Sequence, residues 1–123
     1  MSWKYLIIRE EDNRVTASVE TEDSISSLKH YVRHSPDGFE FGYSGSGPAD
    51  LARSILIDYF IRDGYEESEA IVYVEKIYQE FKEKVISSSR IELEITSIYI
   101  LGWMMSYCQE LYNEIYGDNK DEV

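Results

Sequence analysis

The spacing of apolar residues changes near residue 47, and only a mixed architecture accommodates both patterns. Before this point apolar and polar residues alternate, as at Val15, Ala17 and Val19, with the two-residue period of a strand that has one wet face. After it, apolar residues recur three and four positions apart, which is the helical period. Strands followed by helices predict an α+β fold, in which three helices pack on one face of a small antiparallel sheet.

The first predicted hairpin lies at the start of the chain. Residues 4–9 hold a β-prone apolar run, residues 10–13 form a polar turn, and residues 14–20 alternate apolar with polar side chains. Two such segments joined by a short polar stretch are typical of paired antiparallel strands. A further alternating segment at 91–95 predicts one short, late strand with a single wet face.

A second hairpin is predicted over residues 28–43, around a strong turn at 35–38. In the turn sequence Ser-Pro-Asp-Gly, proline presets φ at the second position and glycine accepts a positive φ where the chain reverses. The strand after the turn would carry Phe39, Phe41 and Tyr43 on one face, because successive strand residues point to opposite sides. This hairpin would add two strands to the sheet.

Two helices are predicted directly after the glycine-rich loop. Pro48 suits the first turn of the first helix, where its missing N–H needs no partner, and Asp50 adds a favourable negative charge there. Gly64 suits the left-handed cap that ends this helix. The second helix is predicted over 66–86, from apolar residues at helical spacing opposite a charged face.

The third predicted helix, 96–116, is apolar almost all round. Thr96 or Ser97 can cap its start. A helix without a polar face is either central to the core or shared with another chain. We therefore predict a homodimer or a protein-partner contact through the aromatic side chains that lie off its inner stripe. These aromatic residues are Tyr99, Trp103, Tyr107, Tyr112 and Tyr116.

Length and segment composition predict one domain and its compartment. With 123 residues, the chain is expected to form a single α+β domain over 1–116, followed by a flexible acidic tail at 117–123. The first residues show no signal-peptide pattern, and the apolar stretch 95–111 falls short of the ~20 residues of a membrane span. We expect a cytoplasmic protein without a membrane partner. Cys108, the single cysteine, excludes an internal disulfide and is predicted to be a small buried hydrophobe.

The net charge of −12 excludes one class of partner. Residues 1–47 carry a balance of −3 and residues 48–123 one of −9, and neither part contains a cluster of Lys and Arg. Nucleic-acid binding draws most of its strength from contacts between cations and phosphates. We therefore predict no direct nucleic-acid binding. The acidity itself either keeps the protein soluble or matches a basic partner surface.

Residues 34–49, HSPDGFEFGYSGSGPA, resemble the signature HSPxGFEWGYGGSGPA of a family of small prokaryotic and phage proteins. Phe41 stands where that family usually has tryptophan, and Ser44 where it usually has glycine. The resemblance covers about residues 28–95, and it implies common ancestry without an assigned activity, because the function of the family is unknown. The matching signature residues are His34, Ser35, Pro36, Gly38, Phe39, Glu40, Gly42, Tyr43, Gly45, Ser46, Gly47, Pro48 and Ala49.

The glycine loop before the first helix is the candidate ligand site. Free N–H groups and the helix dipole attract anions at a helix start. However, Pro48 removes one donor, Asp50 would repel an anion, and no P-loop lysine follows. The alternative is that the glycines let the chain pass closely over the aromatic hairpin. The residues of the candidate ligand site are His34, Ser35, Phe41, Tyr43, Gly45, Ser46 and Gly47.

The sequence contains no pattern that predicts a catalytic or metal-ligating set. His30 and His34 would lie ~13 Å apart along one strand face, too far to share a metal ion. Ser35 and His34 would point to opposite sides with no carboxylate placed to orient them, so hydrogen bonds within the turn are expected instead. Asp50 and Asp58 share one side of the first helix, where we expect both to be solvated. We predict no cofactor.

Two functional hypotheses follow. The first is a small acidic, non-enzymatic interaction protein that binds a protein partner or itself, and the phage members of the resembling family extend this to the modulation of a host complex. The second is an enzyme that handles a small ligand or nucleotide at the glycine loop. The lack of a catalytic constellation favours the first hypothesis.

Overall fold

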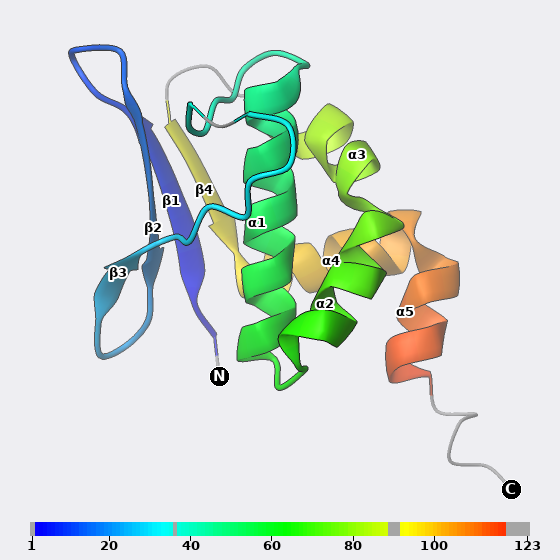
Figure 1. Cartoon of the computed structure of the whole chain (residues 1–123). Helices are drawn as coiled ribbons and strands as arrows, with labels where there is room; N and C mark the ends of the chain where they lie inside the picture. Colours follow the sequence, from blue (N-terminus) through cyan, green and yellow to red (C-terminus); the bar gives the residue numbers. More distant parts are fainter. Residues whose placement is uncertain (1, 36, 89–91, 118–123) are drawn as a thin grey trace, which may run out of the picture.

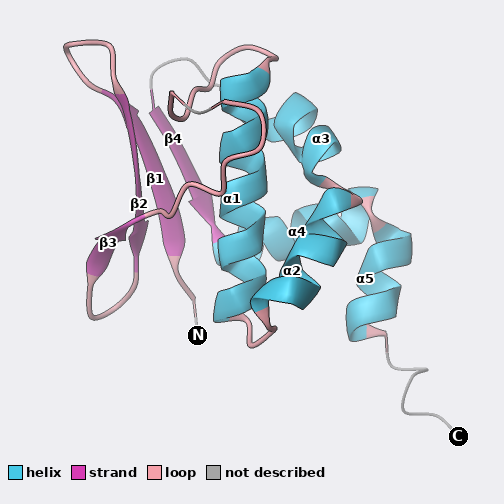
Figure 2. Ribbon diagram, viewed as in Figure 1, coloured by secondary structure: helices cyan, strands magenta, loops and turns pink. Residues whose placement is uncertain are grey.

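Five α-helices lie on one side of a single antiparallel sheet (Figures 1 and 2). The computed structural model describes residues 2–35, 37–88 and 92–117, and this architecture is that of the described residues. The strands follow the spatial order β3-β2-β1-β4. The strands are β1 Lys4–Arg9, β2 Val15–Glu20, β3 Ile25–Ser27 and β4 Glu92–Thr96. The helices are α1 Ser46–Arg62, α2 Glu67–Glu75, α3 Tyr78–Phe81, α4 Ser97–Tyr107 and α5 Gln109–Tyr116, with a π-helical turn η1 at Lys82–Ile86. The α+β class predicted from the sequence is confirmed.

The core surrounds α1: it fills the space between this helix and the sheet and continues between α1 and the other helices. β1 pairs with β2 in the register that sets Tyr5 opposite Val19, which confirms the first predicted hairpin. On its other side β1 pairs with β4, so the late strand is confirmed as well. Alternation turns Tyr5, Ile7 and Val19 toward the helices, where all three are buried. α1 stands between the sheet and the other helices (Figure 1) and is buried along most of its length.

The second predicted hairpin, over 28–43, is wrong, because the described part of this segment forms no strand. Two glycines interrupt any extended course, since Gly38 has a φ of +124° and Gly42 a φ of +88°. The backbone N–H groups of residues 33–35 donate to a side chain of α1 instead of to a neighbouring strand. Pro36, at the centre of the predicted turn, lies outside the described residues.

The two later helices predicted from the sequence are each divided. The helix predicted over 66–86 ends at Glu75 and starts again at Tyr78, because Ile77 leaves the helical region with φ −132° and ψ −12°. The helix predicted over 96–116 breaks at Cys108, where φ is −132° and ψ is 51°. The described residues therefore form five helices where three were predicted.

Two predicted helix ends are confirmed, although the two later predicted helices are divided. Gly64 has a φ of +107° directly after α1, as expected for a left-handed cap. The Thr96 hydroxyl accepts a hydrogen bond from the backbone N–H of Tyr99 at 3.0 Å and so caps α4. In the described part of the chain, no helix has both the length and the apolar character needed to cross a membrane. The predicted acidic tail lies outside the described residues except for Gly117.

Candidate functional site

A buried carboxylate on α1 holds the segment that carries the family-like signature. Asp50 is fully buried, and its oxygens accept hydrogen bonds from the backbone N–H groups of His34 at 2.9 Å and Ser35 at 3.0 Å. The backbone N–H of Arg33 donates to the same carboxylate at 3.2 Å. The His30 imidazole joins it through Nε2 at 2.8 Å. The expectation that Asp50 is solvated is therefore wrong. Its carboxylate accepts the backbone hydrogen bonds of residues 33–35 that a neighbouring strand would otherwise accept.

This environment keeps the carboxyl group of Asp50 ionised. Burial by itself opposes ionisation, but the hydrogen bonds from His30 and from the backbone of Ser35, His34 and Arg33 outweigh it and lower the pKa below the usual value. A carboxylate that accepts several N–H bonds is strongly stabilised in its charged form. Asp50 is thus a negatively charged clamp for the loop.

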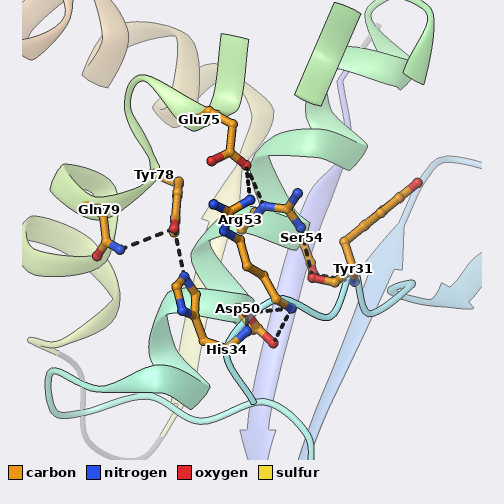
Figure 3. Close-up of polar contacts among 9 residues, drawn as sticks. Tyr31, His34, Asp50, Arg53, Ser54, Glu75, Tyr78 and Gln79 are labelled. Atoms are coloured by element: carbon orange, nitrogen blue, oxygen red, sulfur yellow. Dashed lines mark hydrogen bonds and ion pairs between the residues drawn. The ribbon is translucent and has the colours of Figure 1, made fainter. Parts of the chain in front are cut away.

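Two further residues of α1 extend the clamp (Figure 3). Arg53 and Ser54 follow Asp50 at helical spacing, so all three side chains lie on one face of α1. The Ser54 hydroxyl accepts from the backbone N–H of Tyr31 at 2.9 Å. The Arg53 guanidinium donates to the backbone carbonyl of Tyr31 at 3.1 Å and to the carboxylate of Glu75 at 2.9 Å, which ties the loop to α2.

His34 is held on its far side by α3. Its Nε2 lies 2.7 Å from the hydroxyl of Tyr78, and Gln79 donates to the same hydroxyl at 3.2 Å. Ser35 was expected to bond within the turn, and its hydroxyl donates to the carbonyl of Gly38 at 3.1 Å. His34 was expected to bond there too, but it reaches across to Tyr78 instead. The imidazole Nε2 of His34, the hydroxyl of Ser35 and the backbone N–H groups of both residues therefore bond to other groups of this chain.

The glycine loop passes very close to the segment before it. A Cβ at Gly47 would lie 2.7 Å from the Cβ of Glu40 and 3.2 Å from its backbone nitrogen. A Cβ at Gly45 would lie 2.8 Å from the ring of Tyr43. Both distances are closer than carbon atoms approach. The exposed ring of Tyr43 can turn away from a Cβ at position 45, but the Cβ and backbone of Glu40 cannot, so the path requires glycine at position 47. The carboxylate of Glu40 in turn binds Arg9 at 2.7 Å, which joins the loop to the sheet.

The remaining residues of the predicted ligand site do not form a hollow with the loop. Phe41 is buried in the core beneath the guanidinium of Arg9, whose carbon lies 5.1 Å from the ring centre. Tyr43 is exposed, and Ser46 is exposed at the first turn of α1. Among the described residues, no group of three or more His, Cys, Asp or Glu could hold a metal ion. Ligand binding at these residues stays a prediction.

Asp58, also expected in solvent, takes part in a chain of hydrogen bonds under the sheet. Its carboxylate accepts from the hydroxyl of Tyr5 at 2.7 Å and from Arg62 at 2.7 Å. The Tyr5 hydroxyl accepts from the indole N–H of Trp3 at 2.8 Å. The backbone of Trp3 is fixed as well, because it exchanges hydrogen bonds with Ser97 at 3.1 and 2.8 Å. Trp3 is therefore a rigid aromatic group near the edge of the structure.

Trp3 forms part of a groove at the end of the sheet where β1 begins. The groove has a volume of about 850 Å³. Ile25 and Ile98 also line it and are the most exposed of the large apolar side chains in the described part of the chain, at 67% and 70%. We call this feature the sheet-end groove. A smaller hollow of about 410 Å³ shares Trp3 and the turn between β2 and β3, and it extends to Arg62. The sheet-end groove is lined by Ser2, Trp3, Lys4, Glu20, Thr21, Glu22, Asp23, Ser24, Ile25, Thr96 and Ile98.

The rim of the sheet-end groove is acidic. Among the described residues that line it, Lys4 is the one cation, and Glu20 at 3.2 Å and Glu94 at 3.3 Å already neutralise it. The carboxylates of Glu22 and Asp23 are exposed on the β2–β3 turn and form no ion pair with any described residue. Two carboxylates that form no ion pair in the described chain therefore stand beside an apolar surface, and Arg62, which lines the neighbouring hollow with them, is paired with Asp58.

The aromatic residues predicted as a partner surface divide between the core and the outside. Trp103 is buried, with its ring 4.9 Å from that of Phe81, so it lies in the core. Tyr99 and Tyr107 are half exposed on α4. The rings of Tyr112 and Tyr116 contact each other in a tilted arrangement on α5, and Tyr116 donates to Asp63 at 2.6 Å. A partner could reach Tyr99 and Tyr107 without any change in the fold.

Comparison with known families decides which family the chain is part of. One family model matches residues 8–106, which is most of the chain. The chain belongs to that family, a family of unknown function (DUF6166). The resemblance to a family without an assigned function is thereby confirmed. The searches of curated proteins and of solved structures found no match.

The range matched by the DUF6166 model includes all of the clamp but only part of the sheet-end groove. It includes the Asp50 clamp and Ile25 and Ile98, but it begins after Trp3. Sequence reasoning missed the sheet-end groove, although Ile25 was a signal: it is a single apolar residue inside the polar stretch 21–27. Sequence reasoning also missed Arg53 and its partner Glu75, because no local pattern marks a contact between two helices.

Proposed function

We propose that this protein is a non-enzymatic interaction module, and that the sheet-end groove binds a basic, extended segment of a protein partner. The observation that carries the proposal is the juxtaposition of the exposed Ile25 and Ile98 with the fixed indole of Trp3 and the two acidic side chains of the β2–β3 turn. Burial of apolar side chains of the partner against the two isoleucines contributes favourable binding free energy. Tryptophan is among the residues most often found at interaction hot spots, and Trp3 lines this groove.

The charge of the partner follows from the groove rim. Glu22 and Asp23 form no ion pair with a described residue, so a Lys or Arg of the partner would supply one. The indole face of Trp3 offers a second place for a cation through a cation–π contact. The net charge of −12 adds long-range attraction for a basic segment and speeds its association. The signature resembles that of a family with prokaryotic and phage members, so the natural partner we propose is a protein of a host complex.

An enzymatic role receives no comparable support. In the described residues, the hydroxyl of Ser35 bonds within its own turn, and Asp50 binds the backbone N–H groups of His34 and Ser35. Neither the sheet-end groove nor the smaller hollow beside it is lined by the glycine loop. The contacts therefore favour the interaction hypothesis over the enzymatic one.

The test is a selection of displayed random peptides against the full chain, followed by binding measurements. We expect enriched sequences to combine Lys or Arg with aliphatic or aromatic residues, and to bind with a Kd of about 10 µM that rises with salt. A fluorescent label on one selected peptide allows binding to be followed by anisotropy. Selected peptides that are acidic or show no charge bias would contradict the proposal.

Matched variants locate the binding. The double variant Glu22→Lys with Asp23→Lys should raise the Kd of the selected peptide at least about tenfold, because it removes both rim carboxylates. Glu11→Lys with Glu110→Lys makes the same change in net charge at exposed sites elsewhere, and should alter the Kd by no more than about twofold. Equal effects of the two pairs would show that only overall charge matters. Ile25→Ser should also weaken binding, about tenfold, without lowering the melting temperature.

A further inference from the structure

Helix α4 presents an uncharged surface to solvent in a strongly charged protein. None of its eleven residues is charged, and it lies within the longest uncharged stretch of the sequence, 95–109. Ile98, Tyr99 and Met105 of this helix are half exposed or more. A stripe of large apolar side chains on the outside of a helix is unusual in a monomer and marks a contact surface.

The exposed residues of α4 form one continuous face. At 100° per residue, Ile98, Tyr99, Met105 and Ser106 all fall within about 60° of the direction of Gly102. All five are exposed in the structure. We call these five residues the Gly102 face. It lies apart from the buried side of α4, which carries Ile100, Trp103 and Met104.

The centre of the Gly102 face is hollow. A volume of about 430 Å³ is lined by Tyr99, Gly102, Trp103, Ser106 and Tyr107. Apart from its two neighbours in the chain and the backbone of α4 itself, no described atom lies within 4 Å of the place where Gly102 would carry a Cβ. Small residues at the centre, with large ones beside them, leave room for a second helix to approach closely.

The pattern of the Gly102 face fits a second copy of itself. When two α4 helices cross antiparallel at Gly102, residues equally far before and after it face each other. Ile98 of one copy then lies opposite Ser106 of the other, and Tyr99 lies opposite Met105. Each large side chain meets a smaller or flexible one, and glycine meets glycine at the axis. Such self-complementarity is what a two-fold contact requires.

Charge also favours a second copy over a different partner. Two chains of net charge −12 repel each other wherever charged surfaces meet, so an uncharged face is where they can touch. A basic partner would gain no ion pair from α4, which has no carboxylate. Lys84 lies over the ring of Tyr107 at 4.9 Å, at the border of the face and outside its centre.

We propose that two copies of this chain associate through the Gly102 face, with the α4 helices antiparallel about a two-fold axis at Gly102. The inference goes beyond the proposed peptide binding and does not depend on it, and the two surfaces share one side chain, Ile98. An eleven-residue helix is about 16 Å long, so the contact is smaller than the ~1,600 Å² of a standard interface. The dimer is therefore weak and forms in the micromolar range.

Sedimentation of the full chain from about 1 to about 300 µM tests the proposal. The average mass should rise from the 14.4 kDa of one chain toward twice that value. Gly102→Lys and Gly102→Glu should each remain monomeric, because like charges would meet at the axis. A mixture of the two variants should associate again, since the opposed charges then attract. That rescue is specific to a two-fold contact centred on Gly102.

Two controls separate the proposal from other outcomes. Val72→Lys changes an exposed apolar residue on α2 and should leave the association unchanged. Circular dichroism and the melting temperature check that the variants fold, which we expect because Gly102 faces open space. A wild-type chain that stays monomeric throughout would overturn the proposal. It would also be overturned if the single variants still associate, or if their mixture does not.

Discussion

Replacing Asp50 by asparagine tests whether a buried carboxylate takes the role of a strand partner for residues 33–35. Asparagine has the same shape but offers one acceptor oxygen and one NH2 group. The two oxygens of Asp50 divide the donors: Oδ1 accepts from His34, and Oδ2 accepts from Ser35 and His30. Whichever way the amide is turned, its NH2 faces at least one backbone N–H. One buried donor therefore loses its acceptor in every orientation.

The expected loss of stability follows from these contacts. A buried donor without an acceptor costs about 1–3 kcal/mol, and the hydrogen bonds that remain are weakened because they are no longer charge-assisted. We expect Asp50→Asn to lower the free energy of unfolding by about 2–4 kcal/mol, which is a fall of about 10 °C in Tm for a chain of this size. Asp37→Asn is the matched control, because it removes an exposed carboxylate from the same segment and should shift the Tm by less than about 2 °C.

The pH dependence of this difference provides a second measurement. Because the pKa of Asp50 is lowered in the folded state, its contribution is fully present above the ordinary value of 3.8 and is lost as the pH falls through the lowered folded value. The gap in Tm between wild type and Asp50→Asn should stay constant from about pH 7 to pH 5 and shrink below about pH 4. A gap of less than about 2 °C at neutral pH, or one that widens in acid, would refute the clamp.

Three further predictions concern the scaffold. Gly47→Ala should destabilise the fold by about 1–3 kcal/mol, because the new Cβ would lie 2.7 Å from the Cβ of Glu40. Gly102→Ala should instead stabilise the fold by about 0.5–1 kcal/mol, because alanine has the higher helix propensity and its Cβ would point into open space. Urea unfolding measures both changes. Tyr5→Phe removes the hydroxyl that accepts from Trp3, so it should cost about 1–2 kcal/mol in the same assay and change the fluorescence of Trp3. Burial, aided by a nearby carboxylate, raises the pKa of Cys108 to about 11, so a thiol reagent at about pH 8 should label the native chain at least about 100-fold more slowly than the unfolded chain.

Local patterns in the sequence predicted those parts of the fold that local chemistry determines. The alternation at Val15, Ala17 and Val19 predicted β2, and its pairing with β1 is observed. The cap at Thr96 and the left-handed Gly64 were also predictable, because each depends on one residue and its immediate backbone. In these places propensity and tertiary structure agree.

The sequence misled where tertiary contacts decide the backbone. Residues 28–34 alternate like a strand, but the carboxylate of Asp50 competes for their N–H groups and wins because it is charged and fixed on α1. Asp50 looked like a surface residue of a helix start, since nothing local marks a buried acceptor. The breaks at Ile77 and Cys108 were hidden for the same reason: each lies inside an unbroken helical pattern.

The same competition explains why the signature segment itself is a poor place for a ligand. The three α1 side chains of the clamp face residues 30–35 and leave the loop with few free donors. Glycine at position 47 serves to bring the backbone against Glu40, and a ligand in that space would have to displace the contact. The acidic rim and the exposed apolar groups lie elsewhere, on the β2–β3 turn and on α4. A short sequence that must specify a rigid loop uses its polar atoms within the chain, so surfaces for other molecules arise where the chain leaves groups without partners.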